Sequence, residues 1–419
     1  MSVGRAVVVI LLLAGAAAGL VALVSRTPGE VRLAEPPPGF RDPALGARFT
    51  PQQVARHGAY RGPAYLSLGL SITLQAAVLV IMMRGPFARL IERLDDVRGG
   101  FVVAAALSGA AVVAALTLAG LPLSFVRGYS IEQAWGLSTQ SPGGWAADQL
   151  RALLIGTVTG AVGAVVFFAL VRWQPRTWWL WGWGAFSLLS VLLAFVWPVV
   201  VAPLFNRFTP LQDRDLAGRI RALAAAADVS LEDVLVADAS RRSTAENAYV
   251  AGFSQTKRMV LYDTLLRSGT ERETLFVVAH ELGHEAESHV LKNIALSSAG
   301  LFGGFSVLAL LSSRGAWWTW AGASGPSDLR ALPLLVLYAT VVGLLTLPLQ
   351  NAISRAFERR ADAIAMSLTK DPEAAVSSFR RLALSNIADL APPPAAVVLL
   401  YSHPPTAERI RAALRAGAD

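Results

Sequence analysis

Long apolar stretches alternate with shorter arginine-containing segments along most of this chain. A helix that crosses a bilayer needs about 20 predominantly apolar residues, and seven stretches satisfy this requirement. The spans that this pattern predicts are residues 7–24, 64–83, 101–126, 153–171, 178–201, 294–311 and 332–349. We therefore expect a mainly α-helical protein that passes through a membrane seven times.

The first predicted span has features of both a signal peptide and a retained anchor, since Arg5 precedes it and small residues follow. Its apolar stretch is long for a signal sequence, and no clear small-x-small cleavage site follows before Arg26 and Pro28. We expect this segment to be retained as a membrane helix.

Two polar regions complete the chain, residues 206–292 and the helix-patterned tail at 351–419. The expected parts are therefore 1–205 with spans one to five, 206–292, 293–350 with spans six and seven, and 351–419. Loops rich in Lys and Arg stay in the cytoplasm. The loop between the first two spans lies on the same side as both polar regions and carries Arg26, Arg32, Arg41, Arg48, Arg56 and Arg61. We expect the polar regions to face the cytoplasm.

The composition agrees with membrane burial, because 54% of the residues are apolar and 16% are charged, against roughly 25% charged in soluble domains. The net charge of +8 comes almost entirely from arginine, without a basic run, so we expect membrane-surface loops and no nucleic-acid binding. There is no cysteine, which leaves His, Asp and Glu as metal ligands. Abundant Ala, Gly and Arg with little Lys is typical of GC-rich bacterial genomes, so we expect a bacterial cell membrane as the location.

One polar segment carries an arrangement of metal ligands. Residues 273–289 have apolar positions at helical spacing, and His280 and His284 are four residues apart, so their imidazoles project from one helical face. Two such nitrogens can bind one zinc ion at about 2.0–2.1 Å. Glu281 follows the first histidine, where its carboxylate can take a proton from a zinc-activated water. The concentration of three of the five histidines in this segment favours a metal site over a chance histidine pair.

A catalytic zinc has three protein ligands and one open position, and no third histidine follows at the offset that other zinc peptidases use. Glu358 is the best third candidate. Asp362 lies four residues later on the same helical face and could accept the free ring N–H of a ligand histidine. The alternative is that both acids pair with Arg355, Arg359 and Arg360 on a solvated helix. The spacing alone does not decide between the two.

These residues resemble the CAAX prenyl protease 1 type of integral-membrane zinc metallopeptidase, which pairs His-Glu-x-x-His with a later Glu-x-x-x-Asp. Further segments between about residue 130 and 412 are also similar to that family. They are 136–141 with 148–150, 202–211, 247–249 with 257–266, and 402–405 with Glu408 and Arg409. Jointly these segments make the resemblance specific, and the seven-span layout extends it to nearly the whole chain.

The resemblance implies that the seven helices enclose a water-filled chamber with one zinc ion at its cytosolic end. His280, His284 and Glu358 would hold the zinc, and Asp362 would orient a ligand histidine. The soluble part would be a small α+β peptidase unit with a short sheet. This unit would place the active site toward the cytoplasm.

The resemblance also implies roles in catalysis and substrate binding. Glu281 would be the general base, while His403 and Arg409 would stabilise the oxyanion, where a cationic or N–H donor is needed. By itself, His403 resembles a surface turn residue before two prolines. One strand would hold the peptide through main-chain hydrogen bonds along its edge, and its residues are Asn247, Ala248 and Tyr249.

Two other functions remain open from the sequence. A heat-shock type of membrane quality-control zinc protease shares the motif but has fewer spans. A transporter or channel with a structural zinc site would carry ionisable residues within its spans, and few are present. We expect a peptide or protein substrate, with or without a lipid group. We expect His289 to be structural or to support a ligand, without being a ligand itself, and we expect His57 to be incidental. Glu285 replaces the Trp that many eukaryotic members carry.

Overall fold

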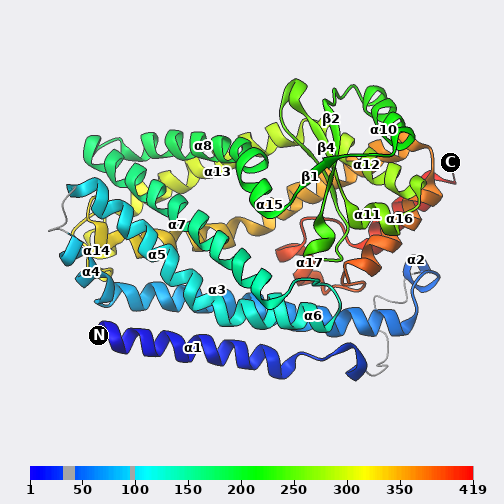
Figure 1. Ribbon diagram of the computed structural model, residues 1–419. Coiled ribbons are helices and arrows are strands. Elements are labelled where there is room, and N and C mark those ends of the chain that lie inside the picture. Colours follow the sequence, from blue (N-terminus) through cyan, green and yellow to red (C-terminus); the bar gives the residue numbers. More distant parts are fainter. Residues whose placement is uncertain (32–42, 95–99, 419) are drawn as a thin grey trace.

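The computed structural model describes residues 1–31, 43–94 and 100–418. Within these residues, seven helices are long and apolar enough to cross a membrane, which confirms the predicted number of spans and the mainly helical fold class. In Figure 1 these helices run side by side, and a small sheet with further helices lies at one end of them. The molecule thus consists of a membrane bundle and a polar part.

The membrane helices are α1 (Val3–Val24), α3 (Pro51–Met83), α5 (Gly100–Phe125), α7 (Pro142–Trp173), α8 (Trp178–Val196), α13 (His289–Ser312) and α15 (Leu332–Thr369). Two π-helical segments, Val126–Ile131 and Trp197–Val201, continue α5 and α8 into α6 (Glu132–Ala134) and α9 (Ala202–Phe205). The predicted spans lie inside these helical segments. However, α15 runs for 38 residues, so the boundary predicted at residue 350 falls within a continuous helix.

Burial along the bundle is uneven. The largest apolar cluster joins α3, α5, α7, α8, α13 and α15 at the end remote from the sheet, around Phe168, Trp178 and Leu334. Four helices contain no buried residue in the half nearer the sheet, and the stretches concerned are 142–163, 183–200, 290–304 and 336–350. A helical stretch of about four turns or more without a buried residue does not have other helices packed closely around it. The bundle is therefore loosely packed in the half nearer the sheet. This packing favours the predicted water-filled chamber, which stays a prediction.

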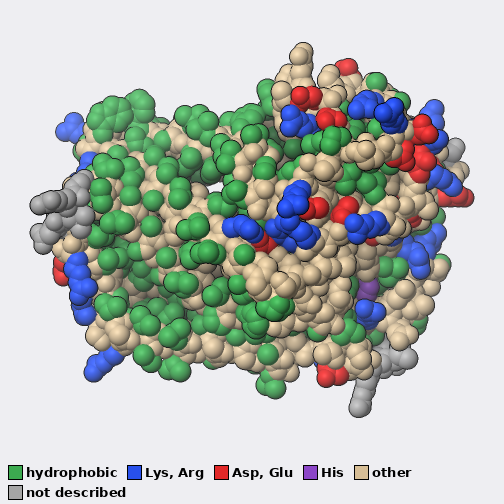
Figure 2. Space-filling view, viewed as in Figure 1, with side chains coloured by type: hydrophobic (Ala, Val, Ile, Leu, Met, Phe, Trp, Pro, Cys, Tyr) green, Lys and Arg blue, Asp and Glu red, His purple; other side chains and the backbone are tan. Residues whose placement is uncertain are grey.

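The surface divides in the same way. Figure 2 shows apolar side chains spread over the membrane bundle and charged side chains gathered over the sheet and its helices. A lipid-facing surface is apolar, whereas a solvated one carries the charges. The molecule therefore lies in the membrane with the polar part on one side.

The sheet has four short strands, β1 (Phe208–Pro210), β2 (Asp233–Ala237), β3 (Ala248–Ala251) and β4 (Arg258–Tyr262), in the order β1-β2-β4-β3. β2 and β4 are parallel, while both outer pairs are antiparallel. Apolar side chains of this sheet, of α10 (Arg214–Ala226) and of α12 (Glu271–Ala286) form a second buried cluster. β3 is therefore an edge strand held beside α12.

The C-terminal tail folds back over α12 and α15. A third cluster, which includes Phe276, Phe379 and Ile410, packs α16 (Pro372–Ser385) and α18 (Thr406–Ala416) against them. The remaining helices are α2 (Pro43–Gly46), α4 (Pro86–Leu94), α11 (Asp263–Ser268), α14 (Gly315–Trp320) and α17 (Pro394–Leu400). This packing brings residues from three distant parts of the sequence to one place.

Candidate metal centre

The helix α12 presents the first two candidate ligands. Thr270 caps its N-terminus, and Glu273 completes a capping box that fixes where the helix begins. His280 Nε2 and His284 Nε2 lie 3.2 Å apart, as two imidazoles on one helical face should. Glu281 lies between the two histidines in the sequence. Its side chain is half-buried, and burial raises the pKa of its carboxyl above the usual range.

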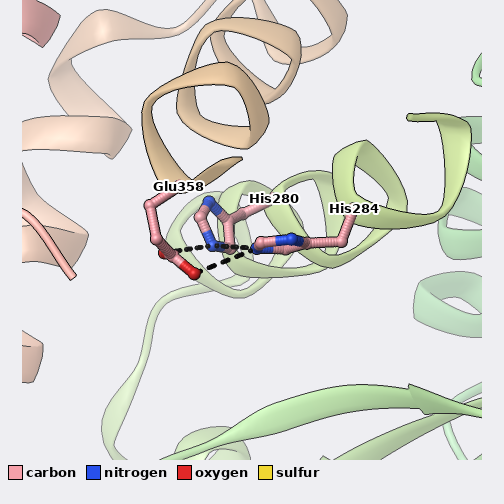
Figure 3. A group of neighbouring side chains, drawn as sticks. All are labelled: His280, His284 and Glu358. Carbon is pink, nitrogen blue, oxygen red and sulfur yellow. Dashed lines mark hydrogen bonds and ion pairs between the residues drawn. The ribbon is translucent and has the colours of Figure 1, made fainter. Parts of the chain in front are cut away.

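α12 and α15 approach each other closely at Gly283. A Cβ atom on Gly283 would lie 3.0 Å from the carbonyl oxygen of Ala361, so a side chain here would force the helices apart. The approach brings Glu358 to both histidines. Its Oε2 lies 3.3 Å from His280 Nε2, and its Oε1 lies 3.3 Å from His284 Nε2 (Figure 3). His280, His284 and Glu358 thus form one group, here called the metal-ligand group, although Glu358 is distant from the histidines in the sequence.

The three ligand atoms fit a tetrahedral metal ion. Two ligands bound tetrahedrally at about 2.0–2.1 Å are separated by roughly 3.3 Å, and the three distances here are 3.2, 3.3 and 3.3 Å. Glu358 Oε2 is buried, and among the described residues no hydrogen-bond donor reaches it with good geometry, which is costly unless a cation compensates. Two imidazoles and one carboxylate are also a ligand set found in zinc peptidases. The group therefore fits zinc.

Asp362 lies behind His280, with its Oδ1 at 2.8 Å from His280 Nδ1. A carboxylate at this position holds the proton on Nδ1 and leaves the Nε2 lone pair for a metal. Burial lowers the pKa of His280, but the neighbouring carboxylates of Asp362 and Glu358 outweigh burial and raise that pKa to about 9. The surroundings of His280 therefore attract positive charge.

Arg409 holds Asp362 from the other side. Its Nε donates to Asp362 Oδ2 at 2.9 Å and its Nη2 donates to Oδ1 at 2.6 Å, while the guanidinium lies 4.2 Å from the ring centre of Phe379. Burial lowers the pKa of Arg409, but the charge of Asp362 outweighs burial and raises it. The resemblance implies an oxyanion role for Arg409, whereas these contacts direct two of its donor groups toward Asp362.

His289 lies closer to the group than the sequence indicates. The predicted helix runs to residue 289, but α12 ends at Ala286 because the chain turns at Ser288, which has a left-handed conformation (φ 52°). The turn brings His289 Nδ1 to 2.9 Å from His284 Nδ1. His289 is buried and stacks on Phe357, with ring centres 4.2 Å apart. His289 thus contacts Nδ1 of His284, the ring nitrogen that is not directed at Glu358.

His403 reaches the group from the C-terminal tail. Its Nε2 lies 3.4 Å from Glu358 Oε1, and its side chain is 60% exposed. Ser402 Oγ lies 2.9 Å from the other ring nitrogen, Nδ1. His403 therefore stands at the accessible side of the metal-ligand group.

Two residues of α15 hold this tail, and neither was predicted to take part in the site. Asn351 Nδ2 donates to the carbonyl of Leu399 at 2.7 Å. Arg355 Nη1 donates to the carbonyls of Val397 at 2.8 Å and Tyr401 at 2.6 Å. Both side chains are buried, so they fix the backbone immediately before His403.

The spacing of Asn351 and Arg355 in the sequence is the feature that could have linked them to the site. Asn351, Arg355, Glu358 and Asp362 follow one another at intervals of four, three and four residues, which puts them on one face of a helix. All four are buried. One face of α15 therefore holds the tail with Asn351 and Arg355, supplies the candidate ligand Glu358 and supports His280 through Asp362.

The predicted peptide-binding residues lie at the start of the edge strand. Tyr262 N donates to Asn247 O at 3.0 Å, and the register pairs Ala248 with Leu261. Alternate residues of an antiparallel strand bond to the partner strand. Asn247, Tyr249 and Ala251 therefore face β4, while the main-chain groups of Ala248 and Val250 point to the outer edge.

Known proteins share both halves of this chain. Residues 43–207 match the CAAX prenyl protease N-terminal region with its five membrane helices, and residues 210–416 match peptidase family M48. The chain is 35% identical over 297 residues to the uncharacterized metalloprotease YhfN of Bacillus subtilis (strain 168), covering 70% of each chain. It is 33% identical over 306 residues to a CAAX prenyl protease 1 homolog of Arabidopsis thaliana, covering 70% of this chain and 69% of that one. The crystal structure of S. mikatae Ste24p has the same fold, with a TM-score of 0.79 over 97% of this chain and 98% of that chain at 23% identity.

The two matched regions meet between residues 207 and 210, where the membrane helices give way to β1. The second region contains His280, His284 and Glu358, the residues that could hold a metal ion. A transporter with a structural zinc site would not account for matches to metalloproteases over both regions. The chain therefore belongs to peptidase family M48 and is a membrane zinc metallopeptidase similar to the CAAX prenyl proteases.

Proposed function

We propose that the chain is an endopeptidase that binds one zinc ion through His280, His284 and Glu358 and cleaves peptide bonds beside the cytoplasmic membrane surface. The observation that carries this proposal is the metal-ligand group itself, with its three ligand atoms 3.2–3.3 Å apart. When bound, zinc supplies Lewis acidity, because it lowers the pKa of a bound water to near 7 and polarises a carbonyl group.

In this proposal Glu281 moves the protons. Its carboxylate accepts a proton from the attacking water and delivers it to the leaving amine. A general base works best when its pKa lies near the working pH, and burial shifts the pKa of Glu281 upward in that direction. Asp362 keeps the proton of His280 on Nδ1, and Arg409 acts through Asp362.

His403 is the proposed oxyanion donor. Ser402 Oγ lies 2.9 Å from its Nδ1, and in this proposal the hydroxyl donates to Nδ1 and leaves the ring proton on Nε2, the nitrogen 3.4 Å from Glu358 Oε1. Nε2–H can then donate to the carbonyl oxygen as that oxygen gains negative charge.

The edge of β3 is the proposed peptide-binding site. The outward main-chain groups of Val250 and the outward carbonyl of Ala248 can pair with an extended peptide, which is recognition by strand addition. Asn247 Oδ1 accepts from Ala248 N at 3.0 Å and so covers the first outward N–H. β3 packs beside α12, which aligns the bound peptide with the metal ligands.

The proposed setting is a bacterial cell membrane, with the metal-ligand group toward the cytoplasm. Arg151, Arg241 and Arg242 lie where the bundle meets the sheet and add to the arginines of the first loop, and Lys and Arg mark the cytoplasmic side. Relatives are named CAAX prenyl proteases, and the open half of the bundle adjoins the site. We therefore propose peptides with and without an attached lipid as substrates to compare.

Metal removal tests this function. The full chain in lipid nanodiscs is expected to contain one zinc per chain by mass spectrometry and to cleave an internally quenched peptide. Treatment with 1,10-phenanthroline should abolish cleavage, and added zinc should restore it. Cleavage that survives complete removal of zinc would contradict the proposal, and equimolar zinc without cleavage of any peptide would favour a structural zinc site.

Arg355→Met should lower kcat while zinc content is unchanged. The variant loses both bonds to the tail carbonyls, so His403 is no longer held at its place, and a displacement of about 1 Å can cost roughly 100-fold in rate. Steady-state kinetics with metal analysis would measure this. Arg360→Met is the matched control on the same helix, because Arg360 forms an exposed pair with Glu287. Equal kcat in the two variants would show that the tail does not need Arg355.

A further inference from the structure

The turn between β3 and β4, residues 252–257, carries one large apolar side chain among small and polar ones. Phe253 is 49% exposed. Its ring packs edge-on against Phe195 of the membrane helix α8, with ring centres 5.6 Å apart. An exposed aromatic residue is unremarkable by itself, but this one extends the apolar surface of a membrane helix.

The turn holds Phe253 in a fixed position. Gly252 has φ +104°, and a Cβ there would lie 2.2 Å from the carbonyl oxygen of Thr256, so only glycine fits. Thr256 N and Oγ1 donate to the carbonyl of Phe253 at 3.0 and 2.9 Å. Phe253 is therefore exposed on a turn whose backbone conformation is held by hydrogen bonds and by the glycine before it.

The face of α8 that Phe253 touches is directed at lipid. Trp183 and Ser187 hydrogen-bond to Ser298 of α13, which marks the packed side of α8. The opposite side of α8, continued into the π-helical segment after it, is an exposed apolar stripe at helical spacing. It is formed by Trp181, Leu188, Leu192, Phe195 and Val199, which are 50%, 59%, 50%, 42% and 73% exposed. A membrane helix presents such a stripe to the bilayer.

Phe195 lies near the depth at which the hydrocarbon core ends. The helical span that begins with α8 runs from Trp178 to Phe205, which is longer than the roughly 30 Å core needs, whereas the 19 residues of α8 alone are about 28 Å long. Its first turns are rich in Trp, as at a membrane interface, and Phe195 is one residue from the other end. In Figure 1 the sheet lies just beyond that end of α8. Phe253 is therefore at the level of the second interface, where aromatic side chains are favoured.

We propose that this turn is a bilayer-docking element, with Phe253 at the headgroup level of the cytoplasmic leaflet beside α8. The occupant of this surface is lipid, because the surface continues the lipid-facing stripe. Figure 2 shows the same transition, from apolar side chains over the bundle to charged ones over the sheet.

The docking has a consequence for substrate that rests on the proposed function. β3 leads into this turn, and Lys257, the last residue of the turn, has its Nζ 2.8 Å from Glu285 on α12, next to His284. The bilayer contact and this ion pair therefore hold the same end of the edge strand. A peptide paired with β3 would then have one end close to both the membrane surface and α12.

The absence of cysteine allows a direct test with single spin labels. Phe253→Cys, Leu188→Cys on the lipid-facing stripe and Ser230→Cys in the exposed turn after α10 would be labelled in the full chain, reconstituted in phosphatidylethanolamine–phosphatidylglycerol vesicles. Electron paramagnetic resonance then compares collisions with oxygen, which partitions into lipid, and with a nickel chelate, which stays in water.

The expected oxygen-to-nickel ratio is above unity at 253 and 188 and below unity at 230. A ratio below unity at 253, as at 230, would overturn the proposal. Retention of zinc in each variant would show that the fold is intact. Because the measurement needs no turnover, an inactive protein would still test the docking, so failure of this inference is separate from failure of the proposed function.

Discussion

Glu281→Gln is expected to remove peptide hydrolysis while the metal site stays loaded. The amide has the same size as the carboxylate but cannot accept the proton of the attacking water. General acid–base groups contribute roughly 10²- to 10⁴-fold in rate, so kcat should fall by about that factor. Zinc content should stay at the wild-type level, because Glu281 is not one of the three residues that group as metal ligands. Cleavage of a quenched peptide and metal analysis on one preparation would measure both quantities.

The control for this variant is Glu271→Gln on the same helix. Glu271 lies in the first turn of α12 and forms an exposed pair with Arg219, so its loss should leave kcat nearly unchanged. Wild-type hydrolysis by Glu281→Gln would assign the proton transfer to another group. Loss of zinc together with activity would instead make Glu281 part of the metal site.

The sequence predicts well those features that depend on residues close together in the chain. Each membrane helix needs only its own apolar length, so all seven spans were predictable. His280 and His284 share a face because they are four residues apart on one helix. The helix end was harder, because the turn at Ser288 (φ 52°) depends on a single backbone conformation that no hydrophobic pattern encodes. That turn decides the position of His289.

Features that depend on packing between distant helices could not be predicted from spacing. Glu358 could equally have paired with neighbouring arginines, and the close approach of α12 and α15 at Gly283 places it beside the histidines instead. Arg355, considered at first only as a partner for acids, donates to main-chain carbonyls of the tail. In both cases the partner lies far along the sequence. Spacing made Glu358 a candidate ligand but left the alternative open, and the resemblance to a known family favoured the metal site.

The polar face of α15 joins these observations. It continues a membrane helix without a break, so the third candidate ligand is held by the same rigid element that lines the open half of the bundle. Buried polar residues on such a face require partners, and they find them in the tail, in the histidines and in Arg409. The membrane bundle therefore positions the metal-ligand group directly.

Glu358→Gln is expected to weaken zinc binding by more than the roughly 10- to 100-fold that loss of an outer partner costs, and to abolish cleavage at limiting zinc. The amide loses the negative charge between His280 and His284 and leaves two neutral ligands. Competition with a chelator of known affinity would measure the change. Glu408→Gln is the control, because Glu408 pairs with Arg359 at the surface and should bind zinc as the wild type does.

This variant also separates the two roles that the sequence left open for Glu358. If the carboxylate only paired with neighbouring cations, its replacement would leave the zinc affinity unchanged and lower the free energy of unfolding alone. If it is a ligand, the affinity falls even where the fold is retained, and the visible spectrum of bound cobalt(II) changes because a charged oxygen ligand is lost. Unchanged affinity together with an unchanged cobalt spectrum would remove Glu358 from the metal site, and two histidines alone do not supply the three protein ligands of a catalytic zinc.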